Sequence, residues 1–379
     1  MHVVIISRSY PNKINPSSGN FVLNQVEALA KHNIKLGVVG VYNASLKQGL
    51  KPTNIKKYGF YKEEHDNVIN YSHLYPVLPK MHYLNHRIKF RIWKNLLQNY
   101  IDENGKPDLI HLHTFEGGEI AIWAKQKFGI PYIVTEHTSL FYTNEALKWH
   151  IKLADKVYKY SSLNLAVSKA SSSDLSKRFN SEFQYFPNFI DINRFQKTTQ
   201  KKNAFKQFIN IAFLDPKKNQ IMLIEAFHKA FNNDSNYRLK IVGNGPEKSK
   251  LLETIKKLGN ENIILAGYLP QEKVVETLQE SDYFALSSNY ETFGVVIVEA
   301  MSCGLPVIAT RCGGPETIII NEKLGILTDV GDTDAFSKSL KKLIDINFDT
   351  QYIRNYAIDN YSYEALSIRL IELYKTSIR

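Results

Sequence analysis

The sequence predicts an α/β protein of two doubly wound units, each a parallel sheet wrapped by helices, that face each other across a cleft. Short β-branched runs alternate with amphipathic segments through both halves of the chain. The 379 residues are too many for one compact core and suit two domains of ordinary size. A hydrophobic content of 44% can fill two such cores, which excludes a wholly disordered chain.

The first half contains five short apolar runs that predict strands. They are Val3–Ser7, Leu36–Val41, Leu109–His113, Tyr132–Thr135 and Asn164–Val167. Gly19–Lys31 is predicted as the first crossover helix, because apolar side chains recur on one of its faces.

The second half repeats this alternation. Strands are predicted at Ile209–Phe213, Leu239–Val242, Ile263–Ala266, Tyr283–Leu286 and Val307–Ala309. Helices are predicted between them at Ile221–Phe231, Pro246–Leu258 and Val295–Cys303.

The polar run after Phe195 marks the join between the two units. We therefore predict a first domain over residues 1–190 and a second over residues 191–360. Tyr352–Ile378 is a long amphipathic ending, and its last part, about residues 360–379, is predicted to pack back on the first domain. Ligands of doubly wound sheets bind at the carboxyl ends of the strands, so we expect the chemistry in the loops there.

The net charge of +11 is uneven along the chain. Residues 1–190 carry 24 basic and 14 acidic side chains, whereas the remainder carries 24 and 23. A basic half indicates an anionic partner, which is nucleic acid, a phospholipid surface or a phosphorylated substrate. Of these three partners we favour nucleic acid least, because the sequence has no evident aromatic platform or recognition helix.

Three features of the sequence indicate the cellular compartment of the protein. No apolar run approaches the roughly 20 residues of a membrane span, and the first residues read as a strand in place of a secretory leader. The two cysteines, Cys303 and Cys312, form no disulfide framework, which favours a reducing compartment. We expect a cytoplasmic protein, with contact at the inner face of the cell membrane as a hypothesis.

The stretch Ser287–Pro315 contains two carboxylates and two glycine turns. Glu291 and Glu299 lie eight positions apart, and Gly294 between them precedes a helix that begins near Val295. The amides at the start of that helix form an anion site. Because negative carboxylates repel a phosphate, Glu291 and Glu299 are expected to hydrogen-bond neutral hydroxyls of a sugar and a ribose. The alternative is that Glu291 caps the helix and Glu299 is solvated, but a glutamate within so apolar a helix needs a partner.

Several motifs in order along the chain carry a specific resemblance. The sequence over residues 290–315 resembles the donor-sugar signature of the family 4 retaining glycosyltransferases, which have the two-domain GT-B fold. Other segments are similar to further motifs of that family. They are SYPNKINPSSGNFVLNQVEAL (9–29), PDLIHLHT (107–114), VTEHTS (134–139), FPNFIDINRF (186–195) and VGNGPEKSKL (242–251).

The resemblance implies a transferase that moves a sugar from a nucleotide diphosphate donor with retention and without a metal or other cofactor. It implies that Glu291 holds donor-sugar hydroxyls, that Glu299 binds the ribose, and that Lys218 meets the diphosphate. His113 would lie beside the reacting sugar, and His137 is a weaker expectation on the acceptor side. The remaining residues implied to bind the donor are Gly19, Gly243, Gly245, Phe293, Gly294 and Val295.

One position departs from the family pattern. The family commonly has an Arg–Leu pair followed by a lysine in this loop, and Phe213 stands where that arginine would be. A phenyl ring cannot replace a guanidinium on a diphosphate, so either Lys217 substitutes for it or the loop relies on backbone dipoles. This departure leaves open a weakly active or inactive protein.

Two rival metal sites stay open in the sequence. His111, His113 and His137 together have the composition of a three-histidine zinc site, although His111 also suits packing against a neighbouring element. Asp332-Thr333-Asp334 has the form of a metal-binding D-x-D, but its place before the amphipathic segment Ala335–Leu343 favours a helix cap. We expect no metal.

The segment Lys80–Ile101 mixes basic and aromatic side chains. A basic amphipathic helix can lie in a membrane interface, and an ordinary helix with its apolar face in the core explains the pattern equally well. The basic residues of this patch are Arg87, Lys89, Arg91 and Lys94.

We therefore expect a glycosyltransferase that adds sugar to a glycan or lipid-linked acceptor in the synthesis of cell-surface polysaccharide or glycolipid. One alternative is a GT-B scaffold that binds sugar nucleotides or partner transferases without turnover. Another is a different GT-B enzyme, such as a sugar-nucleotide epimerase or a phosphorylase. The donor sugar, its base, the acceptor, the linkage and the oligomeric state are not readable from the sequence.

Overall fold

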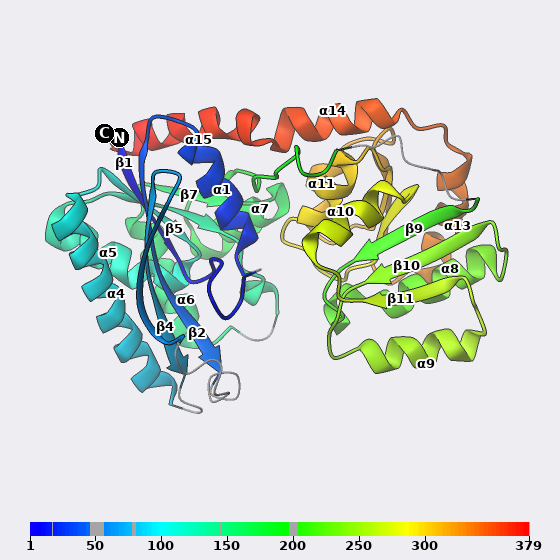
Figure 1. Ribbon diagram of the computed structural model, residues 1–379, viewed down its shortest axis with the longest axis horizontal. Helices are drawn as coiled ribbons and strands as arrows, with labels where there is room; N and C mark the ends of the chain where they lie inside the picture. The colour runs from blue at the N-terminus through cyan, green and yellow to red at the C-terminus, as the bar shows by residue number, and fades with distance from the viewer. Residues whose placement is uncertain (17, 46–56, 78–80, 144–145, 197–203, 379) are drawn as a thin grey trace. The chain divides into compact units, whose positions relative to one another are not determined.

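The computed structural model describes residues 1–379 except 17, 46–56, 78–80, 144–145, 197–203 and 379. The chain divides into two compact units (Figure 1). The first comprises residues 1–167, 172–189 and 366–379, and the second comprises residues 168–171 and 190–365. The main boundary thus falls between Phe189 and Ile190, and the last fourteen residues belong to the first unit.

The first unit is built on an eight-stranded sheet. Its strands are β1 (His2–Ser7), β2 (Lys35–Ser45), β3 (Gly59–His65), β4 (Val68–Val77), β5 (Leu109–His113), β6 (Tyr132–Glu136), β7 (Leu163–Ala166) and β8 (Gln184–Tyr185). The order is β3-β4-β2-β1-β5-β6-β7-β8, and all neighbours are parallel except β3 and β4. The strand order reverses between β1 and β5, which makes their carboxyl ends the expected ligand-binding edge.

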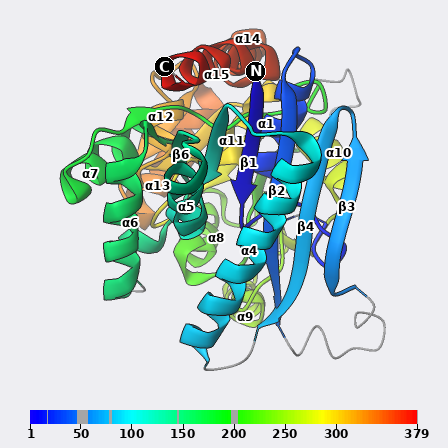
Figure 2. The same ribbon diagram turned by 90° about the vertical axis from the view of Figure 1, so that its left-hand side faces the viewer.

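Helices cover both faces of this sheet. They are α1 (Asn20–Ala30), α4 (His82–Asn104), α5 (Gly118–Phe128), α6 (Lys148–Tyr160), α7 (Lys169–Phe179) and most of α15 (Tyr363–Ile378), with short 3-10 turns η1 (Phe115–Gly117) and η2 (Leu140–Tyr142). Helices α4, α5 and α6 lie across one face (Figure 2), where their apolar side chains form one core with the strands. The fully buried Tyr374 of α15 reaches His111 of β5.

Helix α4 contains the basic segment for which a membrane interface and a core face were both open. Trp93, Leu96, Leu97 and Tyr100 of this helix are buried in the core of the first unit. The apolar face of α4 therefore packs on the core of the first unit along most of its length, as expected for an ordinary helix. No helix in the described part of the chain is long and apolar enough to cross a membrane.

The second unit contains a six-stranded, wholly parallel sheet. Its strands are β9 (Lys206–Ile211), β10 (Tyr237–Val242), β11 (Ile263–Gly267), β12 (Tyr283–Leu286), β13 (Val307–Thr310) and β14 (Gly325–Thr328), in the order β11-β10-β9-β12-β13-β14. The order reverses between β9 and β12. The loops after these two strands are therefore the expected binding edge of this unit.

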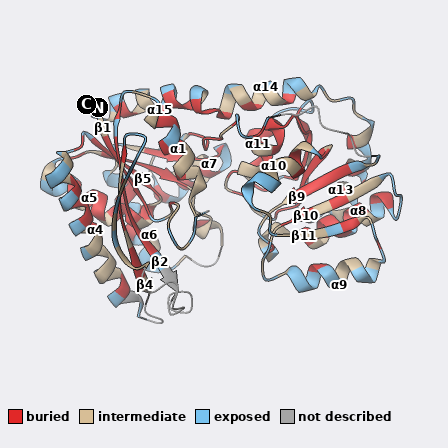
Figure 3. Cartoon of the chain, viewed as in Figure 1, coloured by how far each residue is buried: buried red, intermediate tan, exposed pale blue. Residues whose placement is uncertain are grey.

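The helices of the second unit pack on this sheet and shield its strands from solvent (Figure 3). They are the 3-10 turn η3 (Pro216–Lys218), α8 (Gln220–Phe231), α9 (Lys248–Leu258), α10 (Gln271–Gln279), α11 (Val295–Ser302), α12 (Pro315–Ile318), α13 (Thr333–Asp345) and α14 (Thr350–Tyr361). Asp332 caps α13, because its carboxylate accepts a hydrogen bond from the amide of Ala335 at 2.8 Å. The D-x-D segment is thus a helix start, as its position indicated.

Candidate functional site

The loops at the switch point of the second sheet bring two of the predicted residues into direct contact. Lys218 ends the turn η3 that follows β9, and Glu291 lies in the loop that follows β12. The Lys218 ammonium forms an ion pair with the Glu291 carboxylate, and the Ser288 hydroxyl donates to the same carboxylate oxygen at 3.1 Å. The two side chains are only 17% and 10% exposed, so little solvent screens the pair.

Backbone bonds fix the geometry of these two loops. The Asn289 amide donates to the carbonyl of Lys217 at 2.7 Å, and the Ser287 hydroxyl donates to the carbonyl of Lys218 at 3.0 Å. The Asp215 carboxylate accepts from the Lys218 amide at 3.1 Å and so closes the turn before the lysine. These bonds fix the two loops that carry the ion pair. Little conformational entropy is therefore lost when a ligand binds there.

Helix α11 begins where the sequence predicted it to begin. Gly294 precedes it with a φ of 98°, in the left-handed region that favours glycine, and Phe293 beside it is buried. The amides of Val295 and the residues next to it open the helix, whose dipole favours negative charge at that end. The glycines Gly313 and Gly314 permit this loop, since an added Cβ on Gly314 would lie 2.2 Å from the carbonyl oxygen of Phe293.

Glu299 lies one turn into α11, in a setting that favours its protonated form. Burial raises the pKa of this carboxyl to about 7, and the positive charge of Arg194 opposes the rise only in part. The apolar neighbours on the helix, among them Ile297 and Val298, are fully buried. Glu299 is therefore a carboxyl whose charge changes near neutral pH.

The two glycines after β10 are explained by close packing of backbone. An added Cβ on Gly243 would lie 1.9 Å from the carbonyl oxygen of Ala212, and one on Gly245 would lie 2.3 Å from that of Leu214. Both contacts are to the loop after β9, which places these glycines at the binding edge. The predicted strand Ile209–Phe213 ends earlier, at Ile211, so Phe213 stands in that loop with its ring 60% exposed.

In the first unit, the histidines predicted near the reacting sugar form a stacked column. His113 ends β5, and its Nδ1 lies 2.9 Å from Nε2 of His137 in the loop after β6. The rings of His111 and His113 stack at 4.5 Å, and those of His113 and His137 at 5.1 Å. Burial lowers the pKa of His113 to about 3 and holds those of His111 and His137 well below their usual range. All three imidazoles are therefore neutral at pH 7.

Residues that the sequence did not single out hold this column in place. The Gln25 amide nitrogen lies 3.1 Å from Nδ1 of His111 and 3.3 Å from Nε2 of His113. His111 Nδ1 also meets the hydroxyl of Tyr374 at 2.7 Å, and its Nε2 meets that of Thr135 at 2.7 Å. His111 therefore packs against neighbouring elements. Among the described residues, no three His, Cys, Asp or Glu side chains are grouped so that they could hold a metal ion, and these histidines form no such group.

Glu136 ties together the loops that follow β5 and β6. Its buried carboxylate accepts from the amides of Phe115, His137 and Thr138 at 2.9–3.0 Å and from the hydroxyl of Tyr158 at 2.6 Å. The motif VTEHTS contains this glutamate, but nothing in the spacing indicated its four donors.

Gly19 closes the loop between β1 and α1. Its φ is 69°, and an added Cβ would lie 2.2 Å from the carbonyl oxygen of Ser9. The position therefore requires glycine for packing within the loop, independently of any ligand.

Two protein-family descriptions match consecutive parts of the chain. "Glycosyltransferase Family 4" matches residues 18–194, and "Glycosyl transferases group 1" matches residues 191–360. The chain belongs to family 4 of the glycosyltransferases. It is therefore a transferase enzyme, as the motifs predicted.

Named relatives and a solved structure agree with this family. The chain is 29% identical over 324 residues to a probable sucrose-phosphate synthase of Thermosipho melanesiensis, with 75% of each chain covered. It is 26% identical to the putative teichuronic acid biosynthesis glycosyltransferase TuaC of Bacillus subtilis, covering 84% of this chain and 83% of that one. The solved structure of HepE from Anabaena in complex with UDP superposes with a TM-score of 0.73 at 18% identity, covering 99% of both chains. This likeness shows that the glycosyltransferase has the GT-B fold.

Proposed function

We propose that this glycosyltransferase moves a sugar, with retention, from a nucleotide diphosphate sugar to a glycan or lipid-linked acceptor during synthesis of a cell-surface polysaccharide or glycolipid. The observation that carries the proposal is the Lys218–Glu291 pair beside the start of α11, at the switch point of the second sheet. The UDP in the HepE structure and the teichuronic acid role in the name of TuaC support the donor and product classes.

The pair supplies opposite charges for the two halves of such a donor. The diphosphate gains negative charge as the glycosidic bond breaks, and the Lys218 ammonium together with the amides at Phe293–Val295 can stabilise it. The Glu291 carboxylate accepts hydrogen bonds from hydroxyls of the transferred sugar, and Glu299 accepts from those of the ribose. Gly243 and Gly245 border the base. Since Phe213 adds no cation, the cationic side chains of this loop are Lys217 and Lys218.

In the first unit we assign a positioning role to His113. The neutral imidazole carries no positive charge and does not neutralise phosphate; its Nδ1 is held by His137, and its Nε2 meets a sugar hydroxyl by exchanging the longer bond to Gln25. His137 fixes the His113 ring and borders the acceptor side. Lys218 and the backbone dipoles can stabilise the negative charge that develops on the diphosphate. We therefore propose that transfer needs no metal or other cofactor.

Donor screening tests the proposal. UDP-, GDP- and ADP-sugars are added to the protein in the presence of EDTA, and both thermal unfolding and slow donor hydrolysis are followed. A donor at 100 times its dissociation constant stabilises the protein by about 2.7 kcal/mol. We expect one donor class to raise the melting temperature and to be cleaved.

Matched variants connect the result to the site. We expect Glu291→Gln to abolish donor cleavage, whereas Glu253→Gln, an exposed carboxylate of α9 with the same change in charge, leaves it intact. Cleavage that survives in Glu291→Gln, or that requires a divalent cation, contradicts the assignment. Binding without turnover toward donor or acceptor supports the scaffold alternative.

We also propose peripheral contact with an anionic membrane through the exposed basic residues of α4. Arg87 and Arg91 are exposed, and the Lys94 ammonium lies over the rings of Phe90 and Trp123 at 5.7 and 5.1 Å. Because the apolar face of α4 is buried, this contact is electrostatic and weakens with salt. It agrees with a cytoplasmic protein at the inner face of the membrane.

A further inference from the structure

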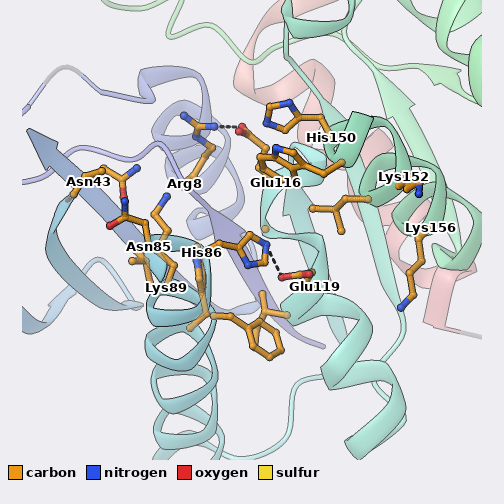
Figure 4. Close-up of a pocket in the computed structure, with 18 residues that line it drawn as sticks. Arg8, Asn43, Asn85, His86, Lys89, Glu116, Glu119, His150, Lys152 and Lys156 are labelled. Atoms are coloured by element: carbon orange, nitrogen blue, oxygen red, sulfur yellow. Dashed lines mark ion pairs between the residues drawn. The ribbon is translucent and has the colours of Figure 1, made fainter. Parts of the chain in front are cut away.

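The first unit contains a cavity of about 830 Å³ beside the carboxyl ends of β1 and β5 (Figure 4). Arg8 follows β1 directly, and Glu116 lies three residues after His113, so the cavity opens at the switch point of the first sheet. Helix α4 forms one wall, with Lys89 on it, and helix α6 forms the opposite wall, with Lys152. None of the residues predicted from the sequence except Lys89 lines it.

The charges that line this cavity do not balance. Arg8 pairs with Glu116, and His86 pairs with Glu119 at 3.1 Å (Figure 4). Both carboxylates are thereby used. The three remaining cations are the lysines Lys89, Lys152 and Lys156, for which the described residues provide no hydrogen bond or ion pair.

Lys89 is the most confined of these three lysines. In Figure 4 its side chain rises from α4 toward Arg8. Burial, and secondly the like charge of Arg8, lower the pKa of its ammonium, and the charge of Glu116 offsets this only in part. A cation that is both desolvated and repelled gains more from a bound anion than an exposed one does.

Apolar side chains line part of the cavity, among them Phe90, Trp93 and Leu153. A smaller, adjoining cavity of about 210 Å³ shares Phe90, Glu119, Leu153 and Lys156 with it and adds Ile122, Trp123 and Gln126. The two cavities together therefore offer cationic groups and a set of aromatic and aliphatic side chains within one region of the first unit.

We propose that these joined cavities bind the acceptor, and that the acceptor is a lipid-linked phosphate whose phosphate meets Lys89 and whose hydrocarbon chain lies along Phe90, Leu153 and Trp123. The inference rests on the proposed transfer to an acceptor and specifies the class of that acceptor. A neutral glycan would leave Lys89 without a partner, and a free phosphate would leave the apolar side chains exposed to water.

The chain offers a direct reporter of binding. It contains three tryptophans, and all three line the two cavities: Trp93 and Trp149 line the larger one, and Trp123 lines the smaller one. Intrinsic tryptophan fluorescence of the full chain therefore reports on this site without a label. Farnesyl phosphate below its micellar concentration is the probe, and farnesol and inorganic phosphate are its apolar and anionic halves.

We expect saturable fluorescence change with farnesyl phosphate, at least tenfold tighter than with either half alone. Lys89→Gln is expected to weaken binding of farnesyl phosphate at least tenfold and to leave that of farnesol within twofold. Lys159→Gln removes the same charge from an exposed position on α6 that lines neither cavity, and is expected to bind as the natural chain does. Circular dichroism melting of both variants shows whether they are folded, and Lys156→Gln replaces Lys89→Gln if the latter is not.

Three outcomes overturn the proposal: farnesol binding as tightly as farnesyl phosphate, inorganic phosphate doing so, or Lys159→Gln losing as much affinity as Lys89→Gln. The proposed function fails separately. Donor cleavage without farnesyl phosphate binding contradicts this acceptor class alone, and farnesyl phosphate binding without cleavage of any donor contradicts the nucleotide-sugar assignment alone.

Discussion

Glu299 is a half-buried residue in a largely apolar helix, and its replacement by glutamine has a calculable effect. Its pKa is about 7 in the folded protein and 4.5 in an ordinary setting. Between these two values the folded chain retains a proton that the unfolded chain has lost. The free energy of unfolding therefore falls as the pH rises from about 4.5 to about 7, and stays low above pH 7.

The magnitude follows from 1.36 kcal/mol for each pH unit between the two pKa values. The ionised carboxyl costs the folded state up to about 3 kcal/mol above pH 7, and only about 1 kcal/mol at pH 5. Glu299→Gln keeps the shape and removes the charge. We expect it to stabilise the second unit by about 3 kcal/mol at pH 8 and by about 1 kcal/mol or less at pH 5.

Urea unfolding at the two pH values measures this difference. The three tryptophans all lie in the first unit, so far-UV circular dichroism is the signal that includes the second. Glu253→Gln, an exposed carboxylate in the same unit, is the matched control and is expected to change stability by less than about 0.5 kcal/mol at either pH. A Glu299→Gln effect that is equal at pH 5 and pH 8 refutes the reasoning, because a lost packing contact does not titrate.

Two further predictions concern the first unit. Gly19→Ala and Gly129→Ala place a side chain at nearly the same backbone angle, with φ of 69° and 66°, but only Gly19 has backbone within 4 Å of the new Cβ. We expect Gly129→Ala to cost about 1 kcal/mol and Gly19→Ala at least twice that, by urea unfolding followed through tryptophan fluorescence; equal costs would contradict the close contact with Ser9. Changing Arg87, Arg91 and Lys94 together to Glu is expected to abolish flotation with anionic liposomes, and unchanged flotation would remove the membrane contact.

Most strands were predictable because each is a short apolar run bounded by polar residues. Strand β12 has the predicted bounds, Tyr283–Leu286, and β5 has the predicted bounds, Leu109–His113. Parallel strands buried on both faces leave this plain signal in composition. The start of α11 was also predictable, because the left-handed backbone just before the helix requires a glycine, Gly294.

The hairpin of β3 and β4 was missed. Strand β3 is an edge strand with exposed, charged residues, and β4 contains tyrosines and a proline, so neither resembles a buried strand. A signal was present in Asp66 and Asn67, which have φ of 48° and 65° and form a two-residue turn between the strands. Asp and Asn tolerate this left-handed region, and such a pair between alternating segments is typical of a hairpin.

The candidate site was predictable in its members and not in their contacts. The family motifs contained both Lys218 and Glu291, but the sequence did not indicate that the two are paired across 73 positions. Nor did it indicate that Tyr374 meets His111, since 263 positions separate them. The cavity beside α4 is lined by Arg8 and by residues of β2, β4, α4, η1, α5 and α6, and nothing in the sequence indicated that these segments meet.

The bond between Tyr374 and His111 also bears on how the chain is made. Residues 190–365 form the second unit, so they leave the ribosome before the first unit can receive its last helix. At 5–20 residues per second, roughly 10 to 40 s separate the synthesis of Phe189 from that of Tyr374. Throughout that interval the nascent first unit keeps Gln25 and His111 without their hydroxyl partner. The first unit therefore cannot complete its native contacts before the second unit has been synthesised, although most of it is encoded first.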